Sequence, residues 1–174
     1  YRQHGPPTYL NWSLMLLGYN AMFQGQPDAA DSYFNEAIDV EVPSRTHSPN
    51  RVIEARRTFR NGQHQQAFRI LRSHLDDILT TDNIQAGLLV AIEFINMMTA
   101  INRQREAADL LRYLETTRLL DNPAWYALVA DAIETLASTD QNETNDAPGP
   151  THHQALQNMV VVLDDLISPH PDVG

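Results

Sequence analysis

Helix-length stripes of apolar residues, interrupted by short turns, constrain this chain more than any other feature of its sequence. The turn residues Gly25, Gly62 and Asn102 lie 37 and 40 residues apart, and apolar residues on both sides of each turn recur three or four positions apart. That spacing places them on one face of an α-helix. Two helices joined by so short a turn form an antiparallel hairpin, so the sequence predicts a series of stacked helical hairpins.

The whole chain, residues 1–174, is expected to be a single all-α domain of about four helix pairs. The expected pairs are approximately residues 7–23 with 28–40, 51–60 with 63–80, 81–101 with 105–120, and 123–136 with 151–167. In the fourth pair the turn is expanded into residues 138–150, which are polar and rich in Pro, Gly, Asn and Asp. We expect this loop to be mobile because it has almost nothing apolar to bury.

A small residue followed by a large one recurs after each turn. Ala30, Ala67 and Ala107 each stand five positions after a turn residue, and a large apolar residue follows four positions later. The small side chain lets two helix backbones approach closely, and the large one fills the next gap. These large residues are Phe34, Leu71 and Leu111.

With these residues the chain resembles the tetratricopeptide repeat (TPR) family, over about residues 8–167. The match is best in the first pair, at Leu14, Leu17, Gly18, Gly25, Ala30, Phe34, Ala37 and Pro43. It departs from the family at His74, where Ala is preferred, and at Asn102, which replaces the turn glycine. The resemblance implies a right-handed α-hairpin solenoid, and another kind of α-hairpin array is the alternative.

The resemblance also implies a binding face, because the first helices of successive TPR pairs line a concave groove. By that analogy the partner-binding residues are Trp12, Met15, Tyr19, Met22, Phe23, Val52, Arg56, Phe59, Arg60, Ile92, Asn96 and Tyr126. Aromatic residues and Met there suit an apolar or amphipathic polypeptide segment. Packing within the core, or against absent parts of a parent protein, is the alternative for the same residues.

Charge is unevenly distributed along the sequence. The chain has a net charge of −10, which argues against nucleic acid as a partner. All basic residues are Arg, and those between Arg45 and Arg72 crowd the second pair, whereas the chain from Asp121 onward has nine acids and no Arg. The arginine cluster can receive an acidic peptide, or the acidic half of another copy in a homo-oligomer; a solvated face is the alternative.

No pattern in the sequence indicates catalysis, a cofactor or a metal. The adjacent carboxylates Asp76-Asp77 and Asp164-Asp165 point in different directions on a helix, and His152-His153 is a poor joint metal ligand. Phosphate-binding glycine loops and the GxSxG motif are missing from the sequence. The chain is therefore expected not to be an enzyme.

The sequence says least about the cellular compartment in which the protein lies. No apolar run is long enough for a membrane span, and the chain has no Cys, which excludes disulfides without fixing a compartment. We expect a cytoplasmic location, with the reservation that a chain starting at Tyr1 can lack an N-terminal targeting segment.

The leading functional hypothesis is a scaffold that binds a peptide or helix of a protein partner in a concave groove. The alternative is a regulatory or sensor domain of a larger bacterial signalling or transcription protein, in which the hairpins hold a neighbouring domain or a small ligand.

Overall fold

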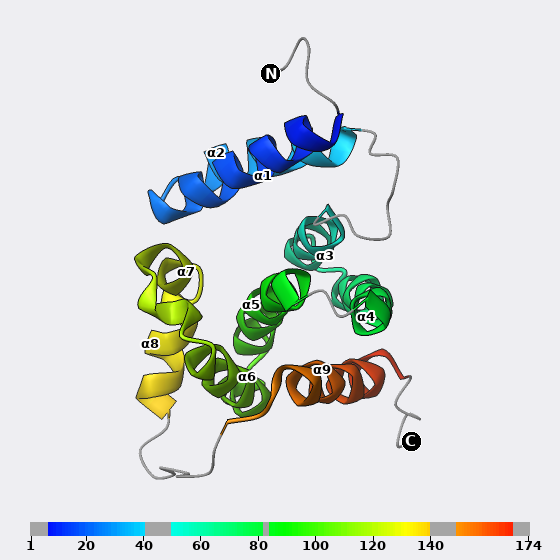
Figure 1. The fold of residues 1–174 in the computed structure, drawn as a ribbon, viewed down its shortest axis with the longest axis vertical. Helices are drawn as coiled ribbons and strands as arrows, with labels where there is room; N and C mark the ends of the chain where they lie inside the picture. The colour runs from blue at the N-terminus through cyan, green and yellow to red at the C-terminus, as the bar shows by residue number, and fades with distance from the viewer. Residues whose placement is uncertain (1–6, 41–49, 82–83, 140–148, 169–174) are drawn as a thin grey trace.

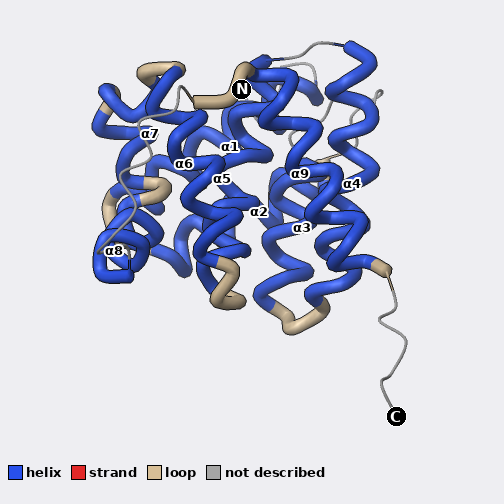
Figure 2. Tube along the Cα trace, turned by 90° about the horizontal axis from the view of Figure 1, so that it is seen from below, coloured by secondary structure: helices blue, strands red, loops and turns tan. Residues whose placement is uncertain are grey.

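The computed structural model describes residues 7–40, 50–81, 84–139 and 149–168. In these ranges it contains nine α-helices, one 3₁₀-helix (η1) and no strand, which confirms the predicted all-α class. The helices are α1 (Pro7–Phe23), α2 (Pro27–Asp39), α3 (Asn50–Arg60), α4 (His64–Thr81), α5 (Ile84–Ala100), α6 (Gln104–Thr116), η1 (Leu119–Asp121), α7 (Pro123–Ala127), α8 (Ala130–Thr139) and α9 (His152–Ile167). Figure 2 shows these helices and the turns that join them.

The first three hairpins, α1–α2, α3–α4 and α5–α6, are confirmed, and each turns at the predicted residue. Gly25, Gly62 and Asn102 all have positive φ, at 65°, 79° and 61°. Glycine adopts this left-handed conformation without strain, and Asn is among the residues that tolerate it best. At each turn the next residue donates its N–H five residues back, as from Gln26 to Ala21 at 2.9 Å, so the last carbonyls of the helix are satisfied.

The small residues after the turns lie at the closest helix contacts. Ala30, Ala67 and Ala107 expose 1% of their surface or less. Gly18 on α1 has the same role against α2, because a Cβ placed on it would lie only 2.3 Å from the Phe34 ring. The α1–α2 hairpin therefore packs closely only because residue 18 has no side chain.

Helix α5 lies at the centre of the molecule and is surrounded by other helices (Figure 1). It contacts α3, α4, α6, α8 and α9, and its residues 89–95 are all buried. Its sequence is largely apolar, which is typical of a helix that is mostly buried. Glu93 is the exception, being charged and 3% exposed.

The expected fourth hairpin is not formed, and this part of the prediction is wrong. The first helix of that pair is interrupted at Leu128 and Val129 and forms α7 and α8. The Asn96 side-chain amide donates to the Leu128 carbonyl oxygen at 3.0 Å. This backbone carbonyl at the interruption therefore has a hydrogen-bond partner on α5. The second helix, α9, packs against α4, α5 and α6 instead of α8 (Figure 1).

The α1–α2 hairpin closes one side of the array. It contacts α3 through α2 and α7 through α1, as seen at the top of Figure 1. The inner wall is therefore bounded by α1, α3, α5, α7 and α8, and it is closed on one side, unlike the open groove that we expected. Most of the loop predicted to be mobile, at residues 140–148, and the family-like Pro43 lie outside the described residues.

Among the described helices, none combines the length and the apolar character that crossing a lipid bilayer requires.

Candidate functional site: an inner cleft and an arginine pocket

A cleft of about 630 Å³, which we call the inner cleft, opens on the inner wall. Its walls come from the C-terminal end of α1, from α3, from α5 and from α8, with a few residues from the adjoining turns, from the start of α2 and from the end of α7. The side chains that we use below are the apolar Met22, Phe59, Met97 and Leu128 and the polar Arg56, Arg60, Glu93, Asn96 and Asp131. A mostly apolar hollow with a few polar groups is the usual form of a binding site.

Each wall is one stripe of a helix. Helix α5 contributes Glu93, Asn96, Met97, Thr99 and Ala100, each of which lies three or four positions from another member of the set. Residues three and four apart share a helix face, so these side chains point to the same side. Helix α3 contributes Arg56, Phe59 and Arg60 by the same spacing, and α8 contributes Asp131, Ala132 and Thr135.

A buried ion pair joins two of these walls. The Arg56 guanidinium donates from Nη1 to the Glu93 carboxylate at 2.9 Å, and the two side chains are 19% and 4% exposed. Burial by itself lowers the pKa of Arg56, but the charge and hydrogen bond of Glu93 outweigh it and raise that pKa. Arg56 therefore stays charged, and the pair ties α3 to α5.

Tyr19 of α1 lies beside this pair and is 8% exposed. Burial, and then the negative charge of Glu93, raise the pKa of the Tyr19 phenol well above its ordinary value. Tyr19 is thus held as a neutral phenol behind the cleft.

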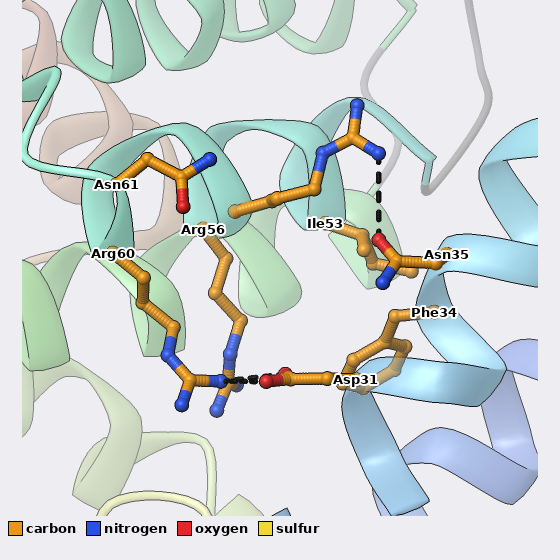
Figure 3. A pocket seen from close by; sticks show the side chains of 8 residues that line it. Asp31, Phe34, Asn35, Ile53, Arg56, Arg60 and Asn61 are labelled. Carbon is orange, nitrogen blue, oxygen red and sulfur yellow. Dashed lines mark hydrogen bonds and ion pairs between the residues drawn. The ribbon is translucent and has the colours of Figure 1, made fainter. Parts of the chain in front are cut away.

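A second cavity of about 390 Å³ lies between α2 and α3, and we call it the arginine pocket (Figure 3). It is lined by Asp31, Phe34, Asn35, Ile53, Arg56, Arg57, Arg60 and Asn61. Arg56 and Arg60 line both cavities, so the arginine pocket adjoins the inner cleft. Three arginines face one aspartate here, which makes the pocket locally positive in a chain whose net charge is −10.

The arginines of this pocket are held with unequal strength. Arg60 Nη1 donates to both carboxylate oxygens of Asp31, at 2.5 and 2.6 Å, although both side chains are more than 40% exposed. Arg57 donates only to the Asn35 side-chain oxygen, at 3.4 Å. The Arg56 guanidinium lies 5.7 Å from the centre of the Phe34 ring, a distance that suits a cation–π contact.

On the other side of the molecule an apolar groove between α4, α5 and α6, the outer groove, is filled by α9 (Figure 1). The buried face of α9 consists of Ala155, Leu156, Met159 and Leu163. Its carboxylates pair with arginines at the rim: Asp164 with Arg72 at 2.7 Å, and Asp165 with Arg103 at 3.5 Å. The fold thus holds an amphipathic helix by an apolar stripe flanked by arginine–carboxylate pairs.

The structure divides the predicted partner-binding residues into groups. Met22, Arg56, Phe59, Arg60 and Asn96 line the inner cleft. Trp12 and Tyr126 are 37% and 45% exposed but lie outside the cleft lining. Phe23 belongs to α1, and its side chain lies outside the described residues.

Four predicted residues are instead part of the core. Met15, Tyr19, Val52 and Ile92 are between 1% and 8% exposed, so the expectation that they face an open groove is corrected to the packing alternative. The physical reason is the closed arrangement of the inner wall, in which α1 contacts α7 and α5 is surrounded.

Sequence reasoning missed Glu93, Met97, Leu128 and Asp131 as cleft residues. Glu93 carried a usable signal, because it is the only charged residue within the apolar sequence of α5. A charge on a buried helix needs an ionic partner, and the preceding hairpin is rich in Arg. Asp131 and Leu128 carried no such signal, since their position depends on the interruption between α7 and α8.

Most of the ionisable groups singled out in the sequence have structural contacts in this fold. Asp76 pairs with Arg72, and the Tyr113 hydroxyl hydrogen-bonds to His152 Nδ1. Burial raises the pKa of Tyr113 to about 12. Within the described ranges, His, Asp and Glu side chains do not gather in the threes or more that could bind a metal ion.

Comparisons of the chain with family models, with curated proteins and with solved structures found no match.

Proposed function

We propose that this chain is a protein-interaction scaffold, a TPR-like array of α-hairpins that binds a polypeptide segment in its inner cleft. The observation that supports this most is the cleft itself, with about 630 Å³ of space, apolar walls and a rim that carries both charge signs. Binding sites for apolar anchors combine these features.

The outer groove supports the same proposal from within the chain. There the hairpins already bury the apolar face of a helix, α9, and pair its carboxylates with arginines. A segment from another protein in the inner cleft would be held by the same kinds of contact. The role proposed here is binding without catalysis.

The test fills the cleft without disturbing the core. Ala100 is exposed at the end of α5 and lines the cleft, so Ala100→Trp places an indole ring in the space that a ligand would use. Ala137 is exposed on α8 outside the cleft lining, and Ala137→Trp is the matched control. Peptides are first selected from a random display library against the whole chain. Their affinity for each protein is then measured by fluorescence anisotropy.

We expect selected peptides to bind the unchanged chain and the Ala137→Trp variant equally, and to lose most of their affinity for Ala100→Trp. Equal binding to all three proteins would place the peptide elsewhere and contradict the cleft. Circular dichroism melting curves establish that each variant is folded.

The second proposal is a regulatory or sensor domain of a larger bacterial signalling or transcription protein. The volume of the cleft favours it, because about 630 Å³ lies within the range of small-ligand pockets, about 300–1,000 Å³. A small metabolite that raises the melting temperature of the chain, but not of Ala100→Trp, would favour this function over the first.

A further inference from the structure

We propose that the arginine pocket is a carboxylate-binding subsite that receives acidic side chains of the segment bound in the inner cleft. This inference rests on the proposed function, because it assigns a chemistry to one end of the same ligand. The occupant is therefore an amphipathic peptide in which Asp or Glu lies next to apolar residues.

Two arginines of the pocket face α2, and one of them has no carboxylate partner among the described residues. Arg57 and Arg60 lie on the same side of α3, one turn apart, and their side chains project toward α2. Arg57 makes no ion pair with a described carboxylate and has only a long hydrogen bond to Asn35. Its positive charge is therefore available to an incoming anion. The planar arginine head favours carboxylates, which it can bind through two parallel hydrogen bonds.

The pocket already holds a carboxylate, that of Asp31, which an incoming carboxylate can replace. Asp31 accepts two short hydrogen bonds from Arg60, which shows that the guanidinium is placed for this chemistry. Both side chains are largely exposed, and exposed pairs of this kind are weak because water and salt screen them. The Arg56–Glu93 pair is buried instead, so it stays in place while Arg60 changes partner.

The arginine pocket and the inner cleft lie side by side. Arg56 and Arg60 line both cavities, so one ligand can place an apolar side chain in the inner cleft and a carboxylate in the arginine pocket. Helix α9 shows the same combination in the outer groove, where Asp164 pairs with Arg72 beside the buried Leu163. The chain thus contains one occupied example of the contact that we assign to the other cavity.

The experiment compares peptides selected by three forms of the full chain. Random peptides are displayed against the unchanged chain, against the double variant Arg57→Gln/Arg60→Gln, and against the control Arg105→Gln. Arg105 is an exposed arginine on α6 that lines neither cavity. We expect Asp and Glu to be enriched beside apolar residues in peptides from the unchanged chain and the control. Peptides from the double variant keep the apolar pattern and lose the acids.

Affinities then test the subsite directly. A selected acidic peptide should bind about fivefold more tightly than its twin with Gln and Asn in place of Glu and Asp. That difference should vanish in Arg57→Gln/Arg60→Gln, and Asp31→Asn should raise the affinity for the acidic peptide by removing the internal competitor. The twin should bind all of these forms alike, which separates the subsite from a general loss of folding.

Four results would overturn the inference. Equal binding of the acidic peptide and its twin removes the subsite but leaves the scaffold function intact, whereas a screen that selects no peptide removes both. A phosphorylated peptide or a single-stranded oligonucleotide that binds the two arginines more tightly than any acidic peptide would replace carboxylate by phosphate. A concentration-dependent dimer that is lost in the double variant would replace the peptide by a second copy of the chain.

Discussion

The inner cleft and the outer groove are built from the same hairpins, yet one is open and the other is filled by the chain itself. In the outer groove, α9 buries Leu156, Met159 and Leu163 against α4, α5 and α6, and its exposed carboxylates reach arginines at the rim. In the inner cleft none of the described helices lies over the apolar walls, and the central ion pair, Arg56–Glu93, is buried. The comparison shows that an apolar stripe packs the helix in the outer groove, and that the ion pairs of the two regions differ in burial, with Arg56–Glu93 the more buried.

The largest expected effect separates the two kinds of ion pair. Glu93→Ala leaves the buried Arg56 without its carboxylate, and breaking a buried pair costs about 3–5 kcal/mol. Chemical denaturation measures the loss in the free energy of unfolding. Asp164→Ala, which removes an exposed partner of Arg72, is the control and should cost no more than about 1 kcal/mol. If both variants lose the same amount, burial does not distinguish the two regions.

The next prediction tests how firmly the outer groove holds α9. Leu156 is 2% exposed, and Leu156→Ala should lower the free energy of unfolding by about 3 kcal/mol through lost contacts and a cavity. Val161 of the same helix is 67% exposed, and Val161→Ala should change the stability by less than about 0.5 kcal/mol. Similar small losses in both variants would mean that α9 is not docked in solution.

The smallest expected effect concerns the rim of the outer groove. Asp164→Asn and Asp165→Asn each remove a largely exposed pair and should cost about 0.2–1 kcal/mol. Denaturation at low and at high salt checks the assignment, because salt screens exposed charges and the loss should shrink as salt is added. A loss that is large and independent of salt would make these pairs equivalent to Arg56–Glu93.

The hairpins were predictable because their signals are local. Gly25, Gly62 and Asn102 end helices by their own backbone preferences, and the small residues after them report close helix contacts. These features need only a few neighbouring residues, so the sequence is sufficient to place three of the pairs. Their partner-binding role stays a prediction.

Which helices pack against one another could be predicted from the sequence to a smaller extent than the hairpins themselves. The stripe of α9 shows that one face is buried, but it does not say which groove covers that face. The interruption at Leu128 has no Pro or Gly to announce it, and it is accompanied by a hydrogen bond from Asn96 on another helix. Met15 and Tyr19 lie on a helix that is apolar on several sides, so the sequence alone could not choose which of these sides the neighbouring helices cover.

The missing side chain at Gly18 has a consequence on the far side of the Phe34 ring. One edge of that ring lies where a Cβ of residue 18 would be, another contacts Tyr19 at 5.2 Å between centroids, and the Arg56 guanidinium lies over it. A methyl group at residue 18 would overlap the Phe34 ring and displace it. The absence of a side chain on α1 therefore sets where that ring lies and, through the ring, what the Arg56 guanidinium rests on in the arginine pocket.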